Sequence, residues 1–137
     1  MKTLFLISFL MACIPDFNIA AQNFTNPPTF IDNGKILDSL KTAFKCDTIE
    51  VKSRNEKYPI KHYIIVTIIN SKNLPPYLDD KSTTNSLIKN TAKSIINKLK
   101  NANEYQVIEI AFISRTIEKG KEEKLMHLNS QLTISNL

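Results

Sequence analysis

The chain has 137 residues, a length that suits a single domain. Hydrophobic residues make up 42% of it and charged residues 23%, which is typical of a folded globular protein and argues against a disordered chain. The formal net charge is +5, and only two glycines are present, so a glycine-rich phosphate-binding loop is not expected.

The N-terminal segment has the layout of a secretory signal peptide. Lys2 supplies a positive charge, residues 4–11 form an apolar run too short to span a bilayer, and small residues end at Ala21. Residues 1–21 are therefore predicted to be a signal peptide that is cleaved after Ala21. The mature protein is then expected to be secreted or periplasmic.

The same segment supports a second interpretation. The run Leu10-Met11-Ala12-Cys13 resembles the lipobox of bacterial lipoproteins, in which Cys13 would be acylated and become the new N-terminus. The protein would then be a lipoprotein attached peripherally to the bacterial envelope, and one acyl chain gives only marginal attachment. After simple cleavage Cys46 is the only cysteine, so no intramolecular disulfide can form.

A polar, proline-bearing stretch at residues 22–32 follows and is predicted to be an N-terminal arm or linker with two aromatics, Phe24 and Phe30. The remaining residues, 33–137, are predicted to form one domain. Signal cleavage would remove one lysine and one aspartate, so the net charge would stay at +5. Such a basic exported protein suits anionic partners, although charge alone does not specify one.

The first half of the domain predicts one helix and two strands. Residues 33–45 place an apolar stripe on one helical face, and Asp32 is suited to cap its N-terminus. Residues 48–53 alternate apolar and polar side chains, as in a half-exposed strand, and residues 54–58 are predicted to be a polar turn. The stretch 62–70 is rich in β-branched residues and apolar on both faces, which is typical of a central strand.

The second half predicts the same series of elements. Asp79 and Asp80 suit the start of a helix over residues 82–101, which has the strongest helical pattern in the chain. A strand is predicted over residues 105–116, and a second strand over residues 125–134 after a charged turn.

The predicted fold is therefore α+β with the order α-β-β-α-β-β, arranged as a four-stranded antiparallel sheet with two helices on one face. An offset of 59 residues aligns six identical pairs, which suggests internal duplication of an α-β-β unit, although amphipathic helices and strands also reuse these residue types. The pairs are Ile36 and Ile95, Leu40 and Leu99, Lys41 and Lys100, Ala43 and Ala102, Ile49 and Ile108, and Glu50 and Glu109.

The sheet face away from the helices is the main candidate site, because its apolar side chains have no predicted cover except the short aromatic arm. These residues are Tyr63, Ile65, Ile69, Val107, Ala111 and Ile113. The face is expected to bind a protein partner or a second copy of the chain, or to be closed by the arm. A basic hairpin with Lys52, Arg54, Lys57 and Lys61 is the second candidate.

Residues with catalytic or metal-binding potential are few. His62 and His127 lack metal-ligand spacing, and Cys46 is expected to be a small buried residue rather than a nucleophile. No catalytic residue, cofactor or metal site is predicted, and sparse aromatics near the lysines argue against nucleic-acid binding.

Three functions remain open from sequence. The leading prediction is a non-catalytic exported binding module that acts through the apolar sheet face. The first alternative is a small hydrolase, or an inhibitor of one, in the cell envelope. The second is a basic binder of anionic envelope surfaces that uses the hairpin lysines.

Overall fold

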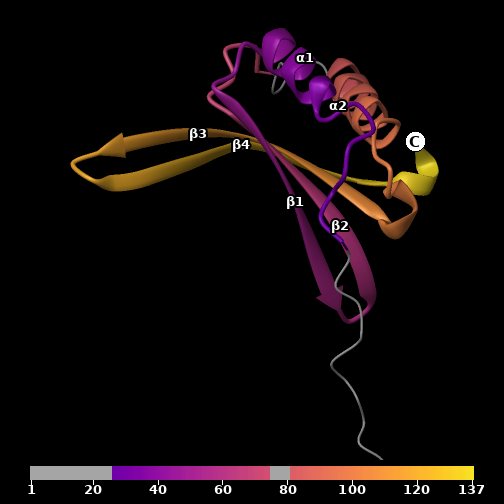
Figure 1. Cartoon of the computed structure of the whole chain (residues 1–137). Coiled ribbons are helices and arrows are strands. Elements are labelled where there is room, and N and C mark those ends of the chain that lie inside the picture. The colour runs from indigo at the N-terminus through magenta and orange to yellow at the C-terminus, as the bar shows by residue number, and fades with distance from the viewer. Residues whose placement is uncertain (1–25, 75–80) are drawn as a thin grey trace, which may run out of the picture.

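The computed structural model describes residues 26–74 and 81–137, which form two helices and one four-stranded sheet (Figure 1). The elements are α1 (Lys35–Phe44), β1 (Thr48–Lys57), β2 (Ile60–Ile69), α2 (Lys81–Ile96), β3 (Val107–Glu118) and β4 (Lys121–Thr133). Short 3-10 helices lie at Ala102–Glu104 and Ile134–Asn136. The chain therefore has the predicted α+β class and element order.

Several sequence predictions fall on residues outside these ranges. They are the signal peptide at residues 1–21, the lipidation site at Cys13, the aromatic residue Phe24 and the helix-start pair Asp79 and Asp80. They stay predictions.

The start of α1 is held by the aspartate expected from sequence. One carboxylate oxygen of Asp32 accepts the backbone N–H of Ile36 at 3.1 Å, and the other accepts that of Gly34 at 3.0 Å. These bonds satisfy donors that a helix leaves unpaired at its N-terminus. The helix ends at Phe44, because the left-handed backbone conformation of the next residue, Lys45 (φ 48°), stops further helical bonding.

The sheet is mixed, so the prediction of an all-antiparallel sheet is wrong. Its order is β1-β2-β3-β4, and the central pair β2–β3 is parallel, with Tyr63 opposite Val107 and Ile69 opposite Ile113. The reason is the connection: α2 carries the chain back to the end where β2 began, so β3 runs in the same direction as β2. Alternation of apolar residues predicts faces but not strand direction, and this is why the sequence pattern did not reveal it.

Both helices pack on one face of the sheet, as predicted, and the core lies between the two layers (Figure 1). The fully buried side chains of the central strands on this face are Ile64, Val66, Ile68, Ile108, Ile110 and Phe112. Helix α2 contributes Ile88, Ala92 and Ile95, while Phe44 of α1 meets Phe112 edge to face at 5.2 Å between ring centroids. Each buried Ile contributes roughly 1.5–3 kcal/mol of transfer free energy.

The described part of the N-terminal arm is docked on the helix side of the molecule. Phe30 forms a β-bridge with Leu99 and packs against the core, and the backbone N–H of Lys100 donates to the Thr29 carbonyl at 2.7 Å. The Tyr105 hydroxyl donates to the Asn26 carbonyl. Phe30 therefore does not close the opposite sheet face, and that part of the sequence hypothesis is wrong.

The two β-hairpins extend in different directions (Figure 1). Because β2 and β3 are parallel, the turn at Tyr58-Pro59 and the turn at Lys119-Gly120 lie at opposite ends of the central pair. Both turn residues of the second hairpin have positive φ (50° and 76°), which suits the twist of a tight hairpin. The predicted polar turn at residues 54–58 is mostly strand, since β1 continues to Lys57.

The proposed duplication is not confirmed. The offset of 59 aligns the start of β1 with the start of β3, but it aligns α1 with residues 94–103. Helix α2 ends at Ile96, so three of the four helical identities fall in the turn beyond it.

Candidate functional site

The six apolar residues predicted to form an interaction surface lie together on the sheet face that points away from α1 and α2, called the far face below. Tyr63, Ile69, Val107, Ala111 and Ile113 are buried, and Ile65 is half-buried. The apolar strip is thus present at the expected place, but little of it is directly accessible.

Arginine side chains of β1 and β3 screen this strip. The Arg54 guanidinium of β1 lies 4.7 Å from the centre of the Tyr63 ring, and its Nη2 lies 3.3 Å from Glu109 of β3. The side chain therefore crosses over β2. Arg115 crosses β2 in the opposite direction and pairs with Glu50 at 3.1 Å. The apolar stems of such residues cover apolar surface while their charged ends stay near water.

All six ion pairs of the described residues lie on the far face, because each partner projects from the same side of its strand. They are Lys52–Glu50, Arg54–Glu56, Arg54–Glu109, Arg115–Glu50, Arg115–Glu122 and Lys124–Glu122. Apart from Arg54–Glu109, these pairs are partly exposed, and each contributes little, from about 0 to 1 kcal/mol. Their joint effect is a charge-balanced layer over an apolar strip.

Glu109 is the most enclosed charge in this layer, with a side chain only 10% exposed. Its carboxylate accepts three side-chain bonds, from Arg54 at 3.3 Å, Asn129 at 3.2 Å and Gln131 at 2.9 Å. A buried carboxylate is tolerated when it is paired and its oxygens are bonded in this way. Glu109 therefore ties β1, β3 and β4 together across the face.

Two groups of the layer have shifted pKa values. The Lys52 ammonium donates to Glu50 and holds the pKa of that carboxyl below its ordinary value, with help from Arg115 and against the effect of partial burial. The Tyr63 hydroxyl donates to Glu56 at 2.9 Å, which raises the pKa of the phenol.

The far face continues onto the projecting part of the β3–β4 hairpin, where apolar side chains are uncovered. Ile117, 74% exposed, and Met126, 56% exposed, lie on this side. Met126 is paired with Ile113, and Ile117 follows Ile113 in β3 at an even spacing, so both side chains project from the far face. Leu125 is also exposed, but it lies opposite Ser114 on the other side of the hairpin. Ile117 and Met126 are the accessible apolar part of the far face.

The predicted basic hairpin divides into two kinds of residue. Lys52 and Arg54 are engaged by glutamates, whereas Lys57 and Lys61 are exposed at the tip and belong to no ion pair among the described residues. Two apolar side chains accompany them: Tyr58 is 93% exposed and Ile60 is 57% exposed. The exposure of Ile60 was not predicted from sequence.

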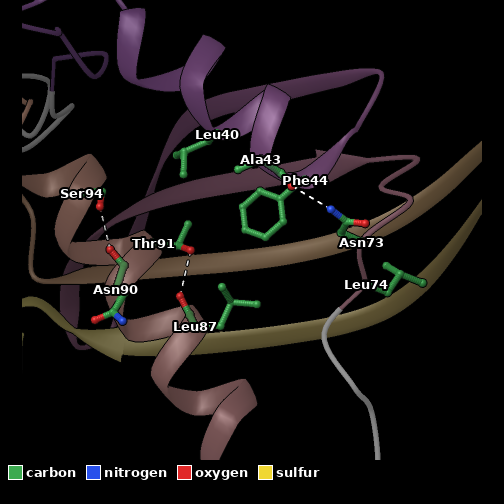
Figure 2. A pocket seen from close by; sticks show the side chains of 9 residues that line it. All are labelled: Leu40, Ala43, Phe44, Asn73, Leu74, Leu87, Asn90, Thr91 and Ser94. Carbon is green, nitrogen blue, oxygen red and sulfur yellow. Dashed lines mark hydrogen bonds between the residues drawn. The ribbon is translucent and has the colours of Figure 1, made fainter.

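A groove of about 420 Å³ lies between the two helices and was not predicted from sequence (Figure 2). Its lining comes from α1, α2 and the chain after β2: Leu40, Ala43, Phe44, Asn73, Leu74, Leu87, Asn90, Thr91 and Ser94. Thr91 and Ser94 donate to backbone carbonyls of their own helix, and Asn73 donates to the Ala43 carbonyl at 2.8 Å. No charged side chain of the described residues lines the groove, and the side chains of Asn73, Thr91 and Ser94 already donate to backbone carbonyls.

The residues considered for catalysis do not gather in one place. His62 Nδ1 lies 2.9 Å from Asn55 Oδ1 at the start of β2, while His127 Nε2 lies 2.5 Å from Ser114 Oγ, beyond the opposite end of the central pair. Cys46 is buried in the core on the helix side, and this burial raises the pKa of its thiol. A buried neutral thiol suits packing rather than nucleophilic attack.

Metal and membrane features are equally sparse in the part of the chain that the structure covers. Residues 26–74 and 81–137 contain no cluster of three or more His, Cys, Asp or Glu side chains suited to a metal ion. Within the same ranges, neither helix has the length and apolar character needed to cross a bilayer.

Comparison with known proteins finds no matching family model, no similar curated protein and no similar solved structure. The far face and the hairpin tips are therefore the features from which a function can be inferred.

Proposed function

We propose that the protein is an exported, non-catalytic interaction module that pairs with a second copy of itself through the far face. The observation that supports this most is the position of the ion pairs: all six in the described residues lie on this one face, above an apolar strip.

Charge favours a second copy as the partner. The whole chain carries +5, which disfavours close contact between two copies at most orientations. On the far face, however, four glutamates are paired with two lysines and two arginines. Two copies can therefore approach through this face without strong repulsion, and their carboxylates and guanidinium groups can exchange partners across the contact.

Apolar contact would come from the projecting hairpin. Ile117 and Met126 are exposed beside Arg115 and Lys124, a mixture of apolar centre and polar surroundings that is typical of protein interfaces. In a two-fold pair each copy uses the same surface, so Ile117 and Met126 of one copy would be buried by the far face of the other.

Multi-angle light scattering over a range of protein concentrations tests this proposal. We expect the mass to rise from that of one chain to that of two as concentration increases. The double substitution Ile117→Ser with Met126→Ser should keep the protein at the mass of one chain. Both side chains are exposed, so the fold should not depend on them.

Leu125→Ser is the matched control, because Leu125 is a similarly exposed apolar residue on the other side of the same hairpin. It should leave pairing unchanged. The proposal is wrong if the unsubstituted chain stays at the mass of one chain at every concentration, or if Leu125→Ser weakens pairing as much as the double substitution.

A further inference from the structure

We propose that the tip of the β1–β2 hairpin, residues 57–61, binds the surface of an anionic lipid bilayer. The tip combines two features that occur together nowhere else among the exposed large apolar residues of the described chain: a nearly fully exposed aromatic ring, and two lysines that form no ion pair and outnumber the one glutamate beside them.

The tip carries a net positive charge. Lys57 and Lys61 flank Tyr58-Pro59-Ile60, and all five residues are exposed. The nearest acidic residue in sequence is Glu56, whose two carboxylate oxygens accept from Arg54 and from the Tyr63 hydroxyl. No ion pair of the described residues reaches either lysine.

The apolar groups lie where they could enter the bilayer interface. Tyr58 is 93% exposed at the turn, and Ile60 is 57% exposed at the first position of β2. Tyrosine favours the headgroup region because its ring is apolar and its hydroxyl is polar, and lysines beside it can reach lipid phosphates. Negative charge on the bilayer complements the tip, and this complementarity selects an anionic lipid surface as the partner.

The tip is also held in place before binding. Strand pairing places Lys57 opposite Ile60 and Glu56 opposite Lys61, so the ladder closes directly below the turn. Little backbone conformational entropy is then lost when the tip meets a membrane.

The other hairpin tip provides a matched comparison within the same molecule. Between Glu118 and Lys124 it carries three lysines and three glutamates, so its charge is balanced. It also exposes Ile117, but no aromatic residue. An anionic membrane that binds net positive charge together with an aromatic ring should distinguish the two tips.

Tryptophan fluorescence of the full chain tests the proposal, because the chain contains no Trp and one introduced residue is a unique reporter. Tyr58→Trp and Ile117→Trp place the reporter at the two tips, both at exposed positions. Vesicles of phosphatidylcholine with roughly 30% phosphatidylglycerol are then added to each variant. The emission of the Tyr58→Trp variant should shift to shorter wavelength, while that of the Ile117→Trp variant should not.

Charge substitutions make the test quantitative. In the Tyr58→Trp background, Lys57→Gln or Lys61→Gln should each weaken vesicle binding about five-fold, and the two together roughly thirty-fold. Lys119→Gln with Lys121→Gln in the second hairpin should change binding by less than about two-fold. Roughly 0.5 M salt should remove most of the emission shift of the Tyr58→Trp variant.

Three results would each overturn the proposal. One is an unchanged emission spectrum of the Tyr58→Trp variant with anionic vesicles. Another is an equal shift with vesicles of phosphatidylcholine alone. The third is equal loss of binding from the lysine substitutions at the two tips, since this would show that general charge, rather than residues 57–61, attracts the protein.

Discussion

The two β-hairpins are built alike but present different chemistry. Each is a pair of antiparallel strands closed by a tight turn, and the turns lie at opposite ends of the parallel central pair. The β1–β2 tip carries lysines outside every ion pair of the described residues, beside Tyr58. The β3–β4 hairpin balances its lysines with glutamates and exposes Ile117 and Met126 on the far face.

This difference shows that lysine count is a poor guide to positive surface. The sequence marks both hairpins as basic, yet Lys52, Arg54, Arg115 and Lys124 are all engaged by glutamates. The two tips differ in net charge: Lys119 and Lys121 of the second tip also form no ion pair among the described residues, but three glutamates balance the three lysines there. The first hairpin is therefore suited to a charged surface, and the second to another protein chain.

The largest expected effect is a difference in stability between substitutions in the buried part of β3 and in its projecting part. Ile110 is fully buried, and Ile110→Ala should lower the free energy of unfolding by about 2–5 kcal/mol. Ile117→Ala, in the same strand but exposed, should change it by less than about 0.5 kcal/mol. Urea unfolding measures both changes in free energy, at protein concentrations too low for two copies to pair. Equal effects would mean that the part of β3 around Ile117 is packed rather than projecting.

A smaller effect is expected from the carboxylate that joins the two hairpins. Glu109→Gln replaces the acceptor of Arg54, Asn129 and Gln131 with an amide, and should cost roughly 1–3 kcal/mol. Glu123→Gln is the control, since Glu123 is exposed in the second tip and has no ion pair within the described residues. Equal urea midpoints for both variants would contradict the bridging role of Glu109.

The smallest effect is a pH dependence that comes from Glu50. Lys52 lowers the pKa of the Glu50 carboxyl in the folded chain below its value in the unfolded chain, so the unfolded chain binds more protons in acid. The stabilisation is complete above the unfolded pKa and is lost as pH falls through the folded one. Because Glu50 and its partners are partly solvated, it should amount to less than about 1 kcal/mol.

Thermal unfolding of the unsubstituted chain and of Glu50→Gln from about pH 6 to about pH 3 measures this contribution. The two stability curves should converge in acid. If they stay parallel throughout, Glu50 does not contribute a folded-state ion pair.

Much of the architecture could be predicted from residue periodicity. The stripe that contains Ile88, Ala92 and Ile95 predicted α2, and the two-sided apolar pattern of residues 62–70 predicted a central strand. Strand direction could not be predicted, because alternation is the same in parallel and antiparallel strands. The chain order with a helix between β2 and β3 was the available signal for a parallel pair.

The site could be predicted only in part, for a different reason. Tyr63 and its neighbours were placed on the correct face, but their burial depends on Arg54 and Arg115 crossing β2 to reach Glu109 and Glu50. Those partners are 55 and 65 residues apart in sequence and meet only through the strand register. The exposure of Ile60 likewise depends on where the helices stop covering the sheet.

Amide hydrogen exchange followed by mass spectrometry tests the division between the two hairpins most directly. The full chain would be compared at low concentration, at high concentration, and at low concentration with anionic vesicles. We predict slower exchange at residues 57–61 only with vesicles, and slower exchange at residues 113–126 only at high concentration. Protection of residues 113–126 by vesicles, with none at residues 57–61, would contradict this account.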